Sequence, residues 1–234
     1  MTAYNKIRKY LIAVDCIVFG YDIMEKEIKL LLIQRSFEPA KGKWSLSGGF
    51  VEDTESLDNA AKRVLFDLTG LKNVFLSQSY TYGDVERDPG ARVISTAYFA
   101  LIKIQDIESK VKKLNHAQWS PLSKLPALIF DHNRMVTDAL KDLGNQVKIK
   151  PVGFELLPEK FTLVQLQELY EAIYQKPIDR RNFRKKILSM SILEKLEEKE
   201  KVTSRRGAYY YHFIPERYKT LRENGFFFEL DFSK

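Results

Sequence analysis

The stretch WSLSGGFVEDTESLDNAAKRVLFDLTGL, residues 44–71, decides the fold of this chain. Its apolar residues recur with the 3.6-residue period of a helix that buries one face, and they are Leu57, Ala60, Ala61, Val64, Leu65 and Leu68. Thr54 or Asp53 can accept the first free N–H groups of this helix, and Gly70 can end it in a left-handed conformation. The spacing therefore predicts one amphipathic helix over most of this stretch.

The glycine pair that precedes the helix allows the backbone to turn sharply and to approach a ligand closely. With these glycines, the stretch resembles the Nudix box, in which Gly, five residues, Glu and seven residues precede Arg-Glu-apolar-x-Glu-Glu-x-Gly-apolar. The positions that match at the right spacing are Gly49, Glu55, Arg63, Leu65, Gly70 and Leu71. The resemblance implies an α/β (α+β) fold, a Nudix-like α/β/α sandwich with a mixed sheet.

The three helix glutamates of the box are absent, because their places hold Val64, Asp67 and Leu68. The family uses those glutamates to hold Mg²⁺ against a diphosphate. Mg²⁺ requires oxygen ligands in near-octahedral geometry, and neither Val nor Leu supplies one. We therefore expect a retained fold without enzyme activity, with no catalytic residue, metal site or cofactor. The alternative is a Mg²⁺-dependent hydrolase of a nucleoside diphosphate derivative, acting through Asp67 and nearby loop acids.

Composition restricts the class of protein. The 234 residues are 44% hydrophobic and 29% charged, as in soluble globular proteins. No apolar run reaches the roughly 20 residues of a membrane span, and no signal-peptide pattern opens the chain. Cys16 is the only cysteine, which excludes an intrachain disulfide and a cysteine zinc cluster. We expect a cytoplasmic protein with no membrane partner, and the net charge of +7 allows an anionic partner.

The rest of the first half supplies the remaining elements of a sheet between helices. Strands are predicted over residues 10–20, 27–35, 74–82, 92–104 and 117–120. A helix is predicted from Asp131, its expected N-cap, to about Leu143, where Gly144 would end it and a linker would follow. We accordingly predict a Nudix-like effector-binding domain over residues 1–150 and a second domain over residues 151–234.

The second half has the pattern of a winged helix-turn-helix. Thr162 and Gln165 form a capping box before an amphipathic helix, and Asp179 can cap the next helix, RRNFRKKILSM. A third helical segment is predicted over ILEKLEEKEKV, and two strand-like halves flank Arg205-Arg206-Gly207. Such a module places its second helix in the DNA major groove. The predicted DNA-binding residues are Arg180, Arg181, Asn182, Arg184, Lys185, Lys186, Arg205 and Arg206, although the same charges also suit a solvated basic face.

The two halves together resemble the Nudix-related transcriptional regulators of bacteria, most specifically in FTLVQLQELYEAIYQKPIDRRNFRKKIL. The resemblance implies a repressor that senses a small ligand, either ADP-ribose or, in one branch, arabinose. We expect arabinose in preference to ADP-ribose, because the diphosphate-holding glutamates are gone.

The mechanism expected from this resemblance is a homodimer on a double-stranded DNA operator, released by the ligand. A nucleic-acid-binding adaptor without an effector remains a further alternative. The predicted effector-binding residues are Lys43, Trp44, Gly49, Asp84, Glu86, Arg92, Asp131 and His132.

Overall fold

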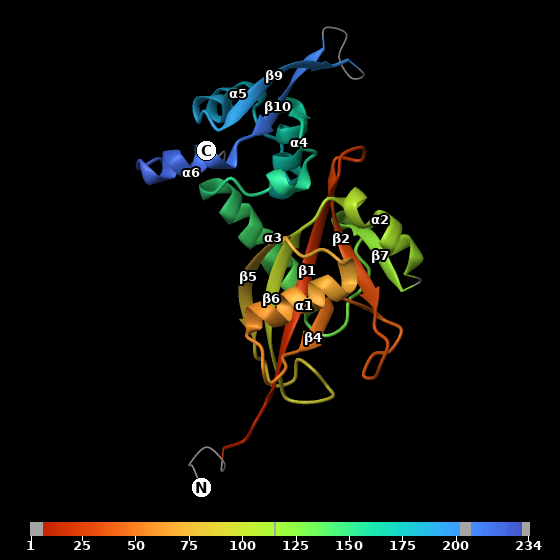
Figure 1. The fold of residues 1–234 in the computed structure, drawn as a ribbon. Helices are drawn as coiled ribbons and strands as arrows, with labels where there is room; N and C mark the ends of the chain where they lie inside the picture. The colour runs from red at the N-terminus through yellow and green to blue at the C-terminus, as the bar shows by residue number, and fades with distance from the viewer. Residues whose placement is uncertain (1–6, 115, 202–206, 231–234) are drawn as a thin grey trace. The chain divides into compact units, whose positions relative to one another are not determined.

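The computed structural model describes residues 7–114, 116–201 and 207–230, and it groups the chain into two compact units (Figure 1). The first unit comprises the chain up to Phe19, Leu30–Ala100 and Ile107–Ala139. The second comprises Gly20–Lys29, Leu101–Asp106 and the chain from Leu140. Because this grouping differs from a division at residue 150, that boundary stays a prediction.

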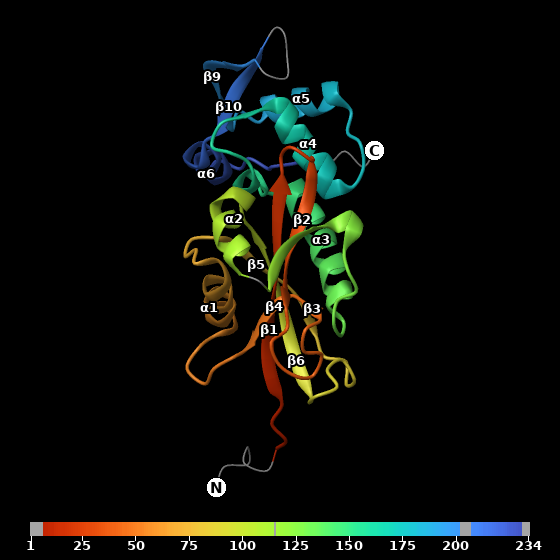
Figure 2. The ribbon, with the colours of Figure 1, turned by 90° about the vertical axis from the view of Figure 1, so that its right-hand side faces the viewer.

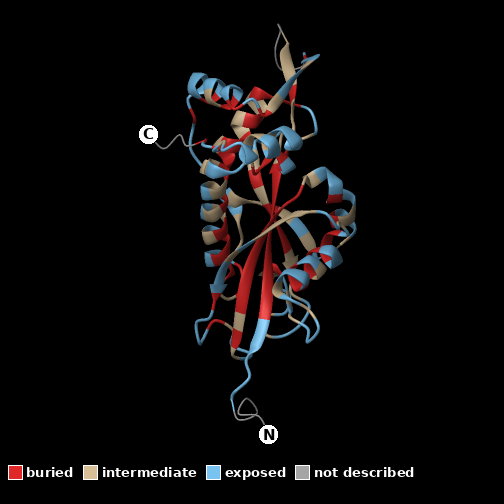
Figure 3. Cartoon of the chain, turned by 60° about the vertical axis from the view of Figure 1, so that its left-hand side comes forward, coloured by how far each residue is buried: buried red, intermediate tan, exposed pale blue. Residues whose placement is uncertain are grey.

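A seven-stranded sheet forms the centre of the first unit. Its main path runs in the order β3-β2-β1-β6-β5, while β4 pairs with β1 and β7 pairs with β2. The strands are β1 (Leu11–Asp22), β2 (Glu27–Gln34), β3 (Trp44–Ser45), β4 (Ser47–Phe50), β5 (Phe75–Tyr82), β6 (Val93–Leu101) and β7 (Ala117–Pro121). The central strand β1 is buried along most of its length (Figure 3).

Helices cover both faces of this sheet, with α1 (Leu57–Thr69) and α2 (Ile104–Lys113) on one side and the first turns of α3 (His132–Ile149) on the other (Figure 2). This is the predicted α/β/α sandwich. The predicted face of α1 is buried, and Gly70 ends the helix with a φ of 75°. The N-cap, however, is Ser56, whose Oγ accepts from the Asn59 N–H, and not Thr54 or Asp53.

Two further predictions for the first half were wrong. No helix was predicted after the strand at residues 92–104, whereas α2 begins at Ile104 and buries Ile107 and Val111. Gly144 lies inside α3 and does not end it, so the expected linker is largely helical. A glycine in a helix costs only about 1 kcal/mol relative to alanine, and the buried face of α3 outweighs that cost.

The second unit contains a winged helix. Its helices α4 (Leu163–Tyr174) and α5 (Arg180–Ser189) accompany a three-stranded sheet in the order β8-β10-β9, formed by β8 (Phe161–Thr162), β10 (Ala208–Phe213) and β9 (Leu193–Glu200). The predicted capping box at Thr162 and Gln165 is present, and Asp179 caps α5. Tyr170 and Phe183 pack their rings 5.8 Å apart, which joins α4 to α5 in one core.

The predicted third helical segment was wrong, because Leu193–Glu200 is the strand β9. Its many Glu and Lys residues favour a helix, but pairing with β10 decides the conformation. The described part of the chain ends with α6 (Pro215–Glu223) and a segment in which Phe228 and Leu230 are buried. Short 3-10 turns lie at Leu122–Lys124 and Phe154–Leu156. Among the described residues, no helix is long and apolar enough to cross a membrane.

Candidate ligand pocket and nucleic-acid interface

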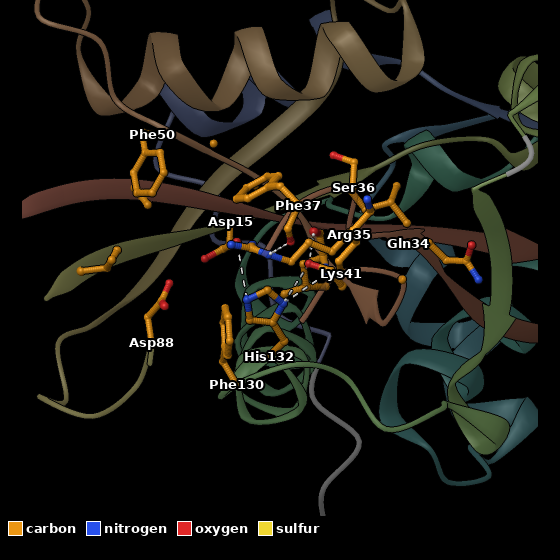
Figure 4. Close-up of a pocket in the computed structure, with 18 of the residues that line it drawn as sticks. Asp15, Gln34, Arg35, Ser36, Phe37, Lys41, Phe50, Asp88, Phe130 and His132 are labelled. Atoms are coloured by element: carbon orange, nitrogen blue, oxygen red, sulfur yellow. Dashed lines mark hydrogen bonds and ion pairs between the residues drawn. The ribbon is translucent and has the colours of Figure 1, made fainter. Parts of the chain in front are cut away.

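A cavity of about 600 Å³ opens in the first unit beside the glycine turn (Figure 4). The strand β1 contributes Asp15 to its wall, and β4 contributes Gly48 and Gly49. The loop after β2 supplies Arg35, Ser36, Phe37 and Lys41, and the segment that begins α3 supplies Phe130 and His132. The cavity thus has carboxylate, cationic and aromatic groups, a mixture suited to a polar ligand that carries a ring.

Among the charged side chains of this pocket, that of Arg87 is less exposed than that of Asp15, at 3% against 10%. Arg87 Nε donates to Asp131 Oδ2 at 2.9 Å and its Nη2 donates to Asp131 Oδ1 at 2.7 Å, a bidentate pair. Burial, the largest single influence, lowers the pKa of Arg87, but the hydrogen bonds to Asp131 and the negative charges of Asp131, Asp15 and Asp88 together outweigh burial and raise it. Arg87 Nη2 also lies 3.8 Å from Asp15 Oδ2. Asp131, the expected helix cap, therefore has its carboxylate engaged by an arginine.

His132 lines the pocket and contacts Leu46 and Asp15. Its Nδ1 accepts a hydrogen bond from the Leu46 N–H at 3.1 Å, so the neutral imidazole carries its proton on Nε2. Nε2 lies 3.7 Å from Asp15 Oδ1. Burial lowers the pKa of His132, against the opposing influence of Asp15 and Asp131. The ring is therefore a neutral donor that faces a carboxylate.

The lowered pKa of His132 predicts a dependence of stability on pH. The folded imidazole stays neutral at pH values where an unfolded one, with a pKa of 6.5, takes up a proton. Stability is then full above about pH 6.5 and declines as the pH falls towards the folded pKa. We expect the free energy of unfolding, followed by tryptophan fluorescence in urea, to decline less steeply below pH 6.5 in His132→Gln. His116→Gln, which changes an exposed histidine, should behave as the wild type; identical slopes in all three would refute the prediction.

Arg35, at the mouth of the pocket, lies over two aromatic rings. Its guanidinium carbon is 4.0 Å from the Phe37 ring centre and 5.4 Å from that of Phe130. Phe130 has a φ of 51°, uncommon for a residue with a side chain, and its ring meets His132 edge-on. Lys41, from the same loop as Arg35, lies near Arg35 in Figure 4. The mouth is therefore cationic and aromatic, whereas the inner end holds Asp15.

Gly48 is required by the position of Asp15. A Cβ placed on Gly48 would lie 2.3 Å from Asp15 Oδ1 and 3.1 Å from the Val14 carbonyl oxygen. Both distances are shorter than normal van der Waals contacts. The glycine turn therefore allows the carboxylate to lie flat against the β4 backbone.

We expect Gly48→Ala to lower the free energy of unfolding by about 1–3 kcal/mol, because the added methyl overpacks the site and displaces Asp15. Urea denaturation followed by tryptophan fluorescence would measure this loss. Gly83→Ala is the matched control, since a Cβ there has no neighbour within 4 Å. A Gly48→Ala protein as stable as the control would contradict the prediction.

The predicted effector-binding residues lie in several places. Gly49 and His132 line the cavity, and Asp131 holds Arg87 at its edge. Asp84 lines a separate hollow with Arg134. The other predicted residues do not line the cavity: Arg92 donates to the Gly83 and Asp84 carbonyls, Lys43 and Glu86 are exposed, and Trp44 pairs with Gln34 in the sheet.

Sequence reasoning missed Asp15, Arg87 and Arg35. Asp15 sits within an apolar strand sequence, where an isolated carboxylate is a signal for a functional or paired group. Arg87 had no comparable signal, because the sequence of its charged loop predicts exposed side chains.

The Nudix helix does not fit a magnesium ion in this chain. Val64 and Leu68 are buried, and Val64 Cγ2 lies 2.9 Å from where a Cβ on Gly49 would stand. Asp67 is exposed, and Glu55 is paired with Arg63. Within the described residues, no group of three His, Cys, Asp or Glu side chains is arranged to hold a metal. The helix face at the glycine turn is thus occupied by hydrocarbon.

The cations of the second unit project from α5. Phe183 and Ile187 are buried, while the exposed residues are Arg180, Arg181, Asn182, Arg184 and Lys185; Lys186 is half-buried. Arg205 and Arg206 lie outside the described residues. On the strand pair, Lys195 and Lys199 approach the Tyr209 ring to 3.6 and 4.4 Å. The arrangement suits contact with a phosphate backbone.

The fold is that of a Nudix-type domain with a pocket, joined to a winged helix. Comparisons with known proteins agree: residues 9–139 match the NUDIX domain family, and residues 153–213 match the NrtR DNA-binding winged helix domain. The chain belongs to the NrtR-like family.

Three relatives illustrate the likeness. The ADPR responsive transcriptional repressor NtrR of Acinetobacter baylyi is 31% identical over 212 residues, which cover 89% of this chain and 84% of the relative. Shewanella oneidensis NrtR complexed with a 27mer DNA is 29% identical, with a TM-score of 0.81 over 94% of this chain and 99% of that one. The NUDIX domain of the same NrtR complexed with ADP ribose is also 29% identical, with a TM-score of 0.52 over 61% and 99%.

Proposed function

We propose that this protein is a cytoplasmic transcriptional repressor whose Nudix-like domain binds ADP-ribose and thereby releases operator DNA. The observation that carries the proposal is the pocket beside the glycine turn, which combines cations with aromatic rings at its mouth. Arg35 and Lys41 suit a diphosphate, and Phe37 and Phe130 suit a base. The relatives named above support the same effector, since two of them are described with ADP-ribose.

The preference for arabinose is set aside. It rested on the loss of the metal-binding glutamates, but Arg35 and Lys41 offer a diphosphate an alternative that requires no metal. The relatives described above also give arabinose no support.

In this proposal DNA is read by α5. Its exposed residues Arg180, Arg181, Asn182, Arg184 and Lys185 face base edges and phosphates, and Lys186, Arg205 and Arg206 add charge. A homodimer would present two such helices to half-sites about one helical turn apart. Release requires that ADP-ribose bind more tightly to a form of the dimer that does not fit both half-sites.

Fluorescence anisotropy on promoter DNA, taken from upstream of the gene itself and of its neighbours, would test this proposal. We expect specific binding that weakens steeply with salt, and release by ADP-ribose but not by arabinose. DNA binding that no nucleotide changes would instead support an adaptor without an effector.

A hydrolase is the competing function, and the buried Val64 and Leu68 oppose it. With Mg²⁺ and ADP-ribose, followed by phosphatase treatment, a colourimetric phosphate assay should show no turnover. Metal-dependent phosphate release would overturn the view of the domain as a sensor only.

A further inference from the structure

Three polar side chains at the inner end of the pocket are at least nine-tenths buried. The exposed fractions of these side chains are 10% for Asp15, 3% for Arg87 and 5% for His132, and all three line the cavity. They come from β1, from the loop before β6 and from the start of α3. Side chains of this kind are normally fully hydrogen-bonded when buried.

The hydrogen bonds of Asp15 and His132 leave one acceptor and one donor over. Asp15 Oδ2 accepts from Ser95 Oγ at 2.6 Å, whereas no described residue donates a hydrogen bond to Oδ1. His132 uses Nδ1 as an acceptor, so Nε2 carries the proton. Nε2 lies 3.7 Å from Asp15 Oδ1, which is beyond hydrogen-bond length. Among the described residues, two that are buried and line the cavity thus keep a free acceptor, Asp15 Oδ1, and a free donor, His132 Nε2, side by side.

Arg87 adds a second donor to the same place. Its Nε and Nη2 are engaged by Asp131, and among the described residues no acceptor engages Nη1. Its Nη2 lies 3.8 Å from Asp15 Oδ2, which puts the guanidinium beside the same carboxylate.

A hydroxyl group satisfies this arrangement, because it donates one hydrogen bond and accepts two. It can donate to Asp15 Oδ1 and accept from His132 Nε2 or Arg87. An ionised phosphate oxygen has no proton to donate and would be repelled by the carboxylate. The inner end therefore selects against phosphate, while the cationic mouth favours it.

We propose that Asp15, Arg87 and His132 form a hydroxyl-binding subsite that selects nucleotide ligands with a free terminal sugar. This inference rests on the proposed function, and it adds an orientation. The terminal sugar enters first, and the diphosphate stays at Arg35 and Lys41. Asp15 is then a specificity-determining residue.

Isothermal titration calorimetry on the full chain tests the subsite by comparing ADP-ribose with ADP, which lacks the terminal sugar. The wild type should bind ADP-ribose more tightly than ADP by about 10- to 100-fold, the range expected for hydrogen bonds to charged groups. Asp15→Asn should remove most of this preference while changing the affinity for ADP little. Asp53→Asn removes an exposed carboxylate that does not line the pocket and should keep the wild-type ratio of affinities.

The outcomes separate the two proposals. If the wild type binds ADP and ADP-ribose equally, or if Asp15→Asn weakens both by the same factor, the subsite is wrong and the ADP-ribose effector stands. If the folded wild type binds neither nucleotide, the effector proposal fails and the subsite with it. The comparison in the wild type decides the question even if Asp15→Asn does not fold.

Discussion

Asp131→Ala is expected to lower the free energy of unfolding of the first unit by about 3–5 kcal/mol. The change leaves the guanidinium of Arg87 buried without its bidentate partner. Removing one member of a buried ion pair is costly because the remaining charge has lost its solvation and its hydrogen-bonded partner. Asp15 Oδ2, at 3.8 Å from Arg87 Nη2, still supplies an opposite charge, but it is too distant to replace the two hydrogen bonds.

Urea denaturation followed by tryptophan fluorescence would measure this effect in the right unit. The chain has two tryptophans, Trp44 and Trp119, and both lie in the first unit. Asp84→Ala is the matched control, because it breaks the exposed pair between Asp84 and Arg134 and should cost no more than about 1 kcal/mol. If Asp131→Ala costs no more than the control, Arg87 is not held in the way that the structure indicates.

The second large effect concerns DNA. The double variant Arg181→Ala/Arg184→Ala is expected to weaken operator binding by about 100-fold or more, since each exposed arginine would lose a charge-assisted contact. If both arginines contact phosphates, the slope of log affinity against log salt should become shallower by about 1.8. The melting temperature should stay close to that of the wild type, because neither side chain is buried.

Anisotropy titrations at several salt concentrations would give both quantities. Lys112→Ala/Lys113→Ala removes the same charge from α2 and keeps α5 intact, so it separates a local contact from the effect of net charge. An equal loss of affinity in both double variants would show that α5 is not the DNA-reading helix.

Local signals explain which elements could be read from the sequence. The period of the apolar residues placed α1 and α4, and the caps at Gly70, Thr162 and Asp179 lie within a few residues of the N–H and C=O groups that they satisfy. The same reasoning placed most strands of the first unit to within a few residues. Where local preference and tertiary pairing disagree, as in β9, the predicted helix was wrong, because composition carries no information about a partner strand.

The sequence by itself therefore determined the Nudix-like sandwich, the winged helix and the basic face of α5. Only the tertiary structure decided which polar side chains meet in the pocket. The residues that make contact lie far apart along the chain, 80 residues for Asp15 and Ser95 and 44 for Arg87 and Asp131. Their contacts depend on the neighbouring positions of β1 and β6 and on the loop that leads to α3. Burial then gives these contacts their strength, because a charge excluded from water must find its partner within the fold.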